Sequence, residues 1–172
     1  NIGGSTLHGA FHFSFGNDTN SVSDKVRDHF RDLFRYLEFV IIDEISLVKA
    51  DLLYQLDARL KEVKCSPHDF FGGVCVLLFG DLMQLQPVRA AWIFNQPMCQ
   101  KYHQAYSYEG SNLWLQFQHI DLKHNHRQGD DKSYADMLNR IRFGQQTEAD
   151  IALLNTRVSD TFPDDALHIY PI

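Results

Sequence analysis

The sequence is poor in cysteine, in long apolar runs and in net positive charge. Its three cysteines, Cys65, Cys75 and Cys99, form no Cys-x-x-Cys pair, which favours a reducing compartment over a disulfide framework or a zinc knuckle. No apolar run approaches the roughly 20 residues needed to cross a bilayer, so we expect no membrane partner. Residues 1–4 contain neither a signal peptide nor an initiator methionine, which suggests a chain cut from something longer.

The composition is that of a folded, mildly acidic domain. The 172 residues are 44% hydrophobic and 13% aromatic, which excludes a disordered tail. A chain of this size can bury roughly 70% of its unfolded surface. The formal charge of −6 argues against a generally basic nucleic-acid-binding surface, although a local DNA groove depends only on where the charges lie.

Residues 22–37 are predicted to form an amphipathic helix, because their apolar residues recur at steps of three and four. The opposite face carries three aspartates, each three residues before an arginine: Asp24, Asp28 and Asp32 before Arg27, Arg31 and Arg35. The arginines could form a phosphate-binding stripe, but the interleaved acids favour a salt-paired, solvated face.

Two short apolar runs flank a second predicted helix. Residues 39–42 and 74–79 are rich in β-branched side chains and too short for helices, so we predict two strands buried on both faces. The segment between them, about residues 50–63, has a helical repeat of leucines. Strand, helix and strand in this order predict a right-handed parallel crossover, and the fold class is therefore α/β.

The rest of the chain is less regular. Residues 88–118 hold many aromatic residues without a clean period and receive no assignment. Residues 120–122 are predicted to form a short strand, and residues 166–170 could form a last one.

Two further helices are predicted between those strands. Residues 131–143 would form the first, ended by Gly144, with three inward residues: Tyr134, Leu138 and Ile141. Residues 147–150 resemble a capping box, with Asp in place of Glu, that opens a helix through Leu154.

Both predicted strands end in acidic residues, Asp43 and Glu44 after the first and Asp81 after the second. In parallel sheets the carboxyl ends of the strands border the ligand crevice. An apolar strand that ends in Asp-Glu is the pattern of a nucleotide-hydrolysing site, where the Asp holds Mg²⁺ and the Glu positions and deprotonates the attacking water. Taken alone, Asp43 could equally cap the next helix and Glu44 could be solvated.

The segment after the second strand favours the nucleotide-hydrolysing site over the alternative of a helix cap. Gln84 lies close enough to the strand end to reach a γ-phosphate or the attacking water, and Pro87 stiffens the segment after it. With residues 80–88 the chain resembles the petite-integration-frequency (Pif) group of superfamily-one DNA helicases, especially the versions carried by Helitron transposons. The resemblance covers nearly all of residues 1–157 and rests on four sequence blocks in the family's order.

The first two blocks concern DNA and magnesium. Residues 3–8 resemble the family's single-strand DNA contact, which would place Thr6 and His8 at the DNA backbone. The alternative is a helix cap with His8 packed nearby. Residues 40–46 resemble the family's Mg²⁺ and catalytic carboxylate motif.

Residues 57–73 resemble the family's signature segment, which is implicated in DNA engagement. Arg59 in this segment is either a DNA contact or an ordinary surface residue. Residues 80–88, the third block, carry Leu82 and Met83 where the family has two aromatics, and Gln86 where it has proline. These departures bear on packing more than on chemistry.

The fourth block, residues 122–128, is followed by a matching segment over residues 137–144. In the family its arginine, here Arg127, reaches the γ-phosphate. A planar guanidinium that stays charged suits this task, and such a residue contributes about 10³–10⁵ in rate. The alternative for Arg127 is an ion pair with a nearby acid.

A phosphate cradle is missing from the sequence. Such a loop needs Gly-x-x-x-x-Gly-Lys-Ser/Thr, and the chain contains no Gly-Lys pair. Residues 129–133 include Lys132 and Ser133, but two aspartates there would repel a phosphate. In the family the cradle lies upstream of the first block, so we expect truncation at Asn1 to explain its absence and the chain alone not to hydrolyse ATP.

The resemblance implies a RecA-like, parallel-sheet helicase core, with an incomplete first motor domain over residues 1–124 and the beginning of a second over residues 125–172. It implies an ATP-dependent DNA helicase that moves 5′ to 3′ and uses Mg²⁺. The resemblance implies catalytic roles for Glu44, Gln84 and Arg127. It implies nucleotide binding by Asp43, Asp81, Gln84 and Arg127, with Asp43 as the metal ligand. It implies DNA binding by Thr6, His8 and Arg59.

The resemblance also implies the oligomeric state, the DNA substrates, the cellular process and the compartment. We expect a monomer that acts on single-stranded and forked DNA during repair, recombination, telomere maintenance or transposition, in the nucleus or the mitochondrion. A second hypothesis is a decayed transposon remnant that at most binds DNA. A third, a nuclease built on Asp43, Glu44 and Asp81, leaves Gln84 and Arg127 unexplained. Zinc at His124 and His126, or at Cys99 and His103, lacks the three or four ligands required.

Overall fold

The computed structural model describes residues 3–13, 23–107, 112–124, 126–127, 129, 131–158 and 167. The strand predicted over residues 166–170, apart from Leu167, lies outside this part of the chain, as do Val22 and the side chain of His103. The chain divides into two compact units, Asn1–His119 and Ile120–Ile172, and each is described by itself. Their predicted identity as parts of two motor domains remains a prediction.

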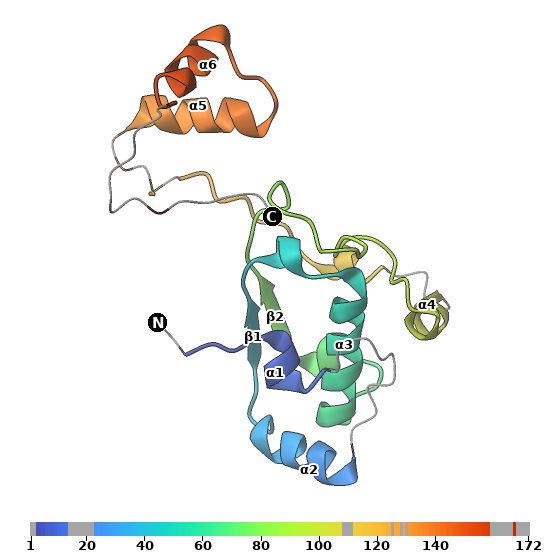
Figure 1. The fold of residues 1–172 in the computed structure, drawn as a ribbon. Coiled ribbons are helices and arrows are strands. Elements are labelled where there is room, and N and C mark those ends of the chain that lie inside the picture. Colours follow the sequence, from blue (N-terminus) through green and yellow to red (C-terminus); the bar gives the residue numbers. More distant parts are fainter. Residues whose placement is uncertain are drawn as a thin grey trace. The chain divides into compact units, whose positions relative to one another are not determined.

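The first unit is built on two parallel strands joined by a helix (Figure 1). Strand β1 (Phe39–Ile42) pairs with β2 (Cys75–Leu78) in register, from Phe39 opposite Cys75 to Ile42 opposite Leu78. Helix α3 (Ala50–Lys64) lies between them in sequence. The α/β fold class and the parallel pairing predicted from the apolar runs are therefore confirmed.

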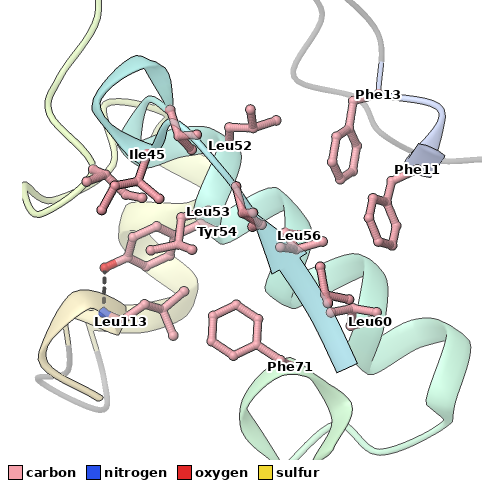
Figure 2. Close-up of a cluster of buried hydrophobic side chains, with 14 of the residues drawn as sticks. Phe11, Phe13, Ile45, Leu52, Leu53, Tyr54, Leu56, Leu60, Phe71 and Leu113 are labelled. Atoms are coloured by element: carbon pink, nitrogen blue, oxygen red, sulfur yellow. Dashed lines mark hydrogen bonds between the residues drawn. The ribbon is translucent and has the colours of Figure 1, made fainter. Parts of the chain in front are cut away.

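The core of this unit lies between the sheet and α3. The buried face of α3 contributes Leu53, Tyr54, Leu56 and Leu60 to a cluster that also contains Ile42 of β1. Figure 2 shows Phe11, from helix α1 (Leu7–Phe11), beside the same cluster. The Tyr54 hydroxyl accepts a hydrogen bond of 3.2 Å from the amide of Leu113, which fixes the 3₁₀ turn η3 (Leu113–Gln116) on the core.

The prediction that both strands are buried on both faces is wrong. Burial alternates along β1, and Phe39 and Ile41 are each 56% exposed, with Leu77 of β2 39% exposed beside them. The reason is that the described residues form only these two strands, and α3 covers only one side of them. A continuous apolar run indicates strands suited to burial on two faces, whereas actual burial depends on what packs there.

Helix α2 (Asp24–Leu33) has the salt-paired face predicted for it. Arg31 bonds Asp28 at 3.3 Å and Arg35 bonds Asp32 at 2.9 Å, while Arg27 pairs with Asp24. Arg27 also reaches Glu62 of α3 at 3.1 Å, so one of these arginines ties the two helices together.

The aromatic segment that received no assignment contains helix α4 (Gln100–Ser107) and the turn η3. Two further 3₁₀ turns, η1 (Ile45–Leu47) and η2 (Phe70–Gly73), follow β1 and precede β2 respectively. The short strand predicted over residues 120–122 is wrong, because this segment has no regular secondary structure, is exposed and pairs with no strand among the described residues.

The second unit contains two helices, α5 (Lys132–Arg142) and α6 (Glu148–Asn155), as predicted. Gly144, at φ +66°, ends the first segment, and Thr147 and Asp150 form the predicted capping box. The inward face of α5 is centred on Met137, while Tyr134 and Ile141 lie on its exposed flanks, which corrects the prediction. None of the helices in the described residues reaches the length and apolarity that a bilayer crossing requires.

Candidate nucleotide site at the sheet edge

The two acid-bearing segments leave the sheet at the same edge. The amide of Phe79, just after β2, donates to the carbonyl of Ile42 at 2.7 Å, and the amide of Ile45 donates back to the carbonyl of Phe79 at 3.0 Å. These bonds continue the parallel pairing beyond the last strand residues. Asp43 and Asp81, which follow the two strand ends, therefore lie at one rim, where a ligand crevice is expected.

Glu44 is held in an unusual backbone conformation at this rim. Its φ and ψ are 55° and 50°, the left-handed region, and its amide donates to the Asp43 carboxylate at 2.9 Å. This conformation costs an ordinary L-residue roughly 1–2 kcal/mol, and such outliers gather at functional sites. Both side chains are exposed. The alternative in which Asp43 caps the next helix is not observed, because Lys49 is at the N-cap position of α3.

The second segment forms a tight turn around Asp81. One carboxylate oxygen accepts from the amide of Met83 at 2.9 Å, and the backbone carbonyl accepts from the amide of Gln84 at 3.1 Å. The side-chain amide of Gln84 donates to the other carboxylate oxygen at 3.4 Å. Gln84 is thus folded back on Asp81 at the rim, and Pro87 is buried behind it.

The residues at the rim fit a magnesium nucleotide. Carboxylate oxygens are the protein ligands that Mg²⁺ prefers, and nucleotide sites commonly hold this ion with one or two carboxylates plus the phosphates. The described residues contain no group of three or more His, Cys, Asp or Glu side chains that could hold a metal ion. Asp43, the carboxylate predicted to hold the ion, is exposed beside Glu44, and its role at the metal remains a prediction.

Thr6 and His8, which are predicted to contact DNA, lie in and beside helix α1. Thr6 accepts a hydrogen bond from the amide of Gly9 at 3.1 Å and caps α1, as the alternative for this block predicted. His8 is half-buried, and its ring meets the edge of Phe13 at 6.2 Å. Burial, and then the nearby Lys49 ammonium, lower the pKa of His8. The DNA contacts of Thr6 and His8 remain a prediction.

Arg59, predicted to be either a DNA contact or a surface residue, is buried in the first unit. Its side chain is 2% exposed, with the guanidinium 5.8 Å from the ring centre of Phe13 and 5.7 Å from that of Phe30. Burial lowers its pKa, an effect that the charges of Glu62 and Tyr102 oppose. A side chain enclosed in this way is not an ordinary surface residue, so that alternative is wrong. The DNA contact of Arg59 remains a prediction.

Arg127 belongs to the second unit and is exposed there. Its action on the γ-phosphate therefore remains a prediction. The neighbouring segment that superficially resembles a phosphate cradle is a helix cap. The Asp131 side chain accepts from the amide of Tyr134 and from the Ser133 hydroxyl, each at 3.0 Å, and so begins α5.

Sequence reasoning missed the role of Asp57. This fully buried carboxylate accepts hydrogen bonds from the amide of Phe71 and the hydroxyl of Tyr106, and Lys61 lies 3.0 Å from it. It therefore joins α3 to α4 and to the turn that leads into β2. The signal was present in the sequence, because Asp57 lies on the apolar face of the predicted helix, three residues before Leu60.

Comparison with known proteins agrees with this geometry. The ATP-dependent DNA helicase PIF1 of Saccharomyces cerevisiae is 31% identical over 97% of this chain and 19% of its own length. The ATP-dependent DNA helicase RRM3 of the same species is 36% identical over 88% of this chain and 20% of its own length. The chain thus spans about a fifth of the length of these relatives.

Solved structures of Pif1 helicases have a fold similar to that of this chain. Bacteroides Pif1 bound to single-stranded DNA has a TM-score of 0.67 and 30% identity, covering 90% of this chain and 36% of that chain. Bacteroides Pif1 with ADP-AlF3 and single-stranded DNA has a TM-score of 0.68 and 29% identity, covering 94% and 38%. The fold is therefore an incomplete RecA-like helicase core. Because residues 1–151 also match the family model described as PIF1-like helicase, the chain belongs to the PIF1-like helicase family.

Proposed function

We propose that this chain is part of an ATP-dependent DNA helicase, to which it supplies the carboxylates that hold Mg²⁺ and activate water. The parallel pairing of β1 with β2 carries the proposal, because it brings Asp43, Glu44, Asp81 and Gln84 to one rim. Curated relatives in the family are named ATP-dependent DNA helicases. A related structure that contains ADP-AlF3 supports a nucleotide as the ligand of this rim.

The proposed chemistry is hydrolysis of the terminal phosphate of ATP. A water oxygen forms a bond to the γ-phosphorus, and the bond from that phosphorus to the bridging oxygen of ADP breaks. Glu44 accepts the proton that the water loses. Asp43 would hold Mg²⁺, which would neutralise phosphate charge. Gln84, oriented by Asp81, contacts the γ-phosphate or the attacking water.

The remaining parts of the proposal rest on the family resemblance and on related structures. Arg127 would donate to the γ-phosphate as charge develops there. The DNA partners would be single strands and forks, since related structures are described as Pif1 bound to single-stranded DNA and as unwinding of forked DNA. We further propose a monomeric enzyme that moves 5′ to 3′ in repair, recombination or transposition, in the nucleus or the mitochondrion.

The experiment that tests this proposal adds a phosphate-binding loop to the chain. Residues 1–172 contain no Gly-Lys pair, so we expect the chain alone not to hydrolyse ATP. Joining an upstream segment with a Gly-x-x-x-x-Gly-Lys-Ser/Thr loop should give ATPase activity that single-stranded DNA stimulates. Glu44→Gln in that longer protein should lower turnover by about 10²–10⁴, since it removes the general base.

Glu38→Gln is the matched control, because Glu38 is an exposed carboxylate at the opposite end of β1. It should leave turnover unchanged. Full turnover in the Glu44→Gln protein would refute the assignment of the base. DNA binding without any ATPase activity in the longer protein would instead support the alternative of a decayed DNA-binding remnant, and Mg²⁺-dependent DNA cleavage without ATP would support the nuclease.

A further inference from the structure

Lys49 and Trp92 face each other across an isolated antiparallel bridge. The adjacent amide of Ala50 donates to the carbonyl of Ala91 at 3.1 Å, which makes the Lys49 and Trp92 pair the closer, non-hydrogen-bonded type. Directly opposite side chains in such pairs project from the same face, with Cβ atoms about 4.5–5.5 Å apart. The side chains of Lys49 and Trp92 therefore start from neighbouring backbone positions on one face where the chain enters α3.

Trp92 is one half of an aromatic stack. Its ring lies 5.6 Å from that of Phe94 at an interplanar angle of 14°. Trp92 is part-exposed and Phe94 is 37% exposed, so solvent reaches both. Trp114 meets Phe94 edge-on at 6.3 Å, and the Asn112 side chain donates to the Phe94 carbonyl at 2.6 Å. These contacts fix the stack in place before any ligand arrives.

The charges around this pair favour an anion. Lys49 is close enough to His8 for its charge to lower the pKa of that ring. Asp51, the nearest acid along the chain, accepts from the amide of Cys99 at 2.9 Å and is part-buried. The surface thus combines a cation with an accessible aromatic face.

We propose that Lys49 and Trp92 form a further contact for single-stranded DNA, in which Lys49 meets a backbone phosphate and a base stacks on the exposed part of the Trp92 ring. This inference rests on the proposed helicase function. It extends the DNA surface predicted at Thr6 and His8 to a segment that sequence reasoning left unassigned. Single-stranded nucleic acids are bound by this combination of backbone cations and aromatic platforms, whereas the bases of duplex DNA are stacked on one another.

The two tryptophans of the chain, Trp92 and Trp114, allow a direct test. In Trp114→Phe the fluorescence reports Trp92 alone, and in Trp92→Phe it reports Trp114 alone. Titration of the 172-residue Trp114→Phe chain with an unlabelled oligo-dT strand should quench the fluorescence, because a base stacks on the reporting ring. The same titration of Trp92→Phe should leave the fluorescence unchanged.

Affinity for a dye-labelled oligo-dT strand, measured by anisotropy at low salt, gives the second readout. Trp92→Ala should weaken binding by about 5- to 100-fold, the range of one base stack. Lys49→Ala should weaken it by about 3- to 10-fold and reduce the slope of log K against log salt by about 0.7, the loss of one phosphate contact. The matched controls Lys25→Ala and Leu115→Ala, both exposed residues, should bind like the parent. A circular dichroism spectrum of each variant verifies folding.

The inference would be overturned by no binding of oligo-dT by the parent chain at low salt, by no quench of the Trp92 signal, or by equal affinity for duplex DNA of the same length. Normal affinity in both Lys49→Ala and Trp92→Ala, with weakened binding in a Thr6 and His8 double variant, would also overturn it and would leave the helicase proposal intact. Failure of the helicase proposal itself appears in the ATPase experiment, which does not depend on either residue.

Discussion

A Cβ atom on Gly80 would lie 2.7 Å from the amide nitrogen of Ile45 and 2.9 Å from its Cγ1. This close approach occurs where the two acid-bearing segments leave the sheet, and the Ile45 amide is also the donor to Phe79. Gly80 has φ +149°, a conformation that side-chain-bearing residues rarely adopt. The position of Asp81 relative to Asp43 therefore depends on a glycine at this point.

Gly80→Ala should lower the free energy of unfolding of the chain by about 1–3 kcal/mol, because the methyl group overlaps backbone that cannot move without breaking the bond between Ile45 and Phe79. Chemical denaturation followed by circular dichroism measures this loss. Gly73→Ala is the matched control, since its φ is +80° but nothing lies within 4 Å of the added Cβ. An equal loss in both variants would mean that backbone strain, and not the contact with Ile45, determines the effect.

Asp57 should be among the most sensitive polar positions in the chain. Asp57→Ala leaves the Phe71 amide, the Tyr106 hydroxyl and Lys61 without their buried acceptor, and we expect a loss of about 3–5 kcal/mol. Tyr106→Phe removes one bond to a charged acceptor and should lose about 1.5–3 kcal/mol. Urea denaturation measures both values.

The control for this network is Asp32→Ala, which removes an exposed ion pair with Arg35 and should change stability by less than about 1 kcal/mol. The effects of Asp57→Ala and Tyr106→Phe should not add in the double variant, because the two residues share a bond. Strict additivity would contradict a coupled network.

The sequence predicted those features of the fold that depend on local periodicity. The apolar run over residues 39–42 is too short for a helix, and the leucines of residues 50–63 recur at a helical period; both segments became the expected elements. The acids at the strand ends were placed at one rim because parallel strands share an edge by geometry alone. No side-chain detail was needed for that step.

Features that depend on distant contacts could not be predicted in this way. The burial of Arg59 is produced by Phe13 and Phe30, which precede it by 46 and 29 residues and whose proximity no spacing rule reveals. The exposed face of β1 depends on which elements pack beside the sheet. The bridge between Lys49 and Trp92 joins residues 43 positions apart, across a segment without any period.

Glu44 offers a test of strain at the rim. Asn adopts the left-handed conformation more readily than Glu, so Glu44→Asn should raise the unfolding free energy of the chain by a few tenths to about 1 kcal/mol. The same substitution should abolish turnover in the longer protein that carries a cradle, because it removes the proposed base. Glu38→Asn, at a residue whose φ is not positive, should not stabilise the chain. A less stable Glu44→Asn chain would show that the conformation of Glu44 stores no strain.

The ion pair of Arg140 and Asp150 should make the second unit sensitive to acid. Arg140 donates two hydrogen bonds to this carboxylate, at 2.8 and 2.6 Å, and the amide of Thr147 donates a third at 2.9 Å. The Arg140 bonds first, and then that of Thr147, hold the pKa of Asp150 well below its usual range. In the unfolded chain this carboxyl has an ordinary pKa of about 3.9.

The unfolded state therefore binds the proton more readily, so this pair stabilises the α5 and α6 hairpin fully above about pH 5 and progressively less as the pH falls through the folded-state pKa of Asp150. Carboxyl-carbon NMR should find Asp150 still ionised at pH 3 in the parent. Arg140→Ala should raise its pKa towards the ordinary value and weaken the hairpin at neutral pH, whereas Arg157→Ala, an exposed arginine next to α6, should leave the titration unchanged. An Asp150 midpoint near 4 in the parent would show that the bonds to Arg140 and Thr147 do not persist in solution.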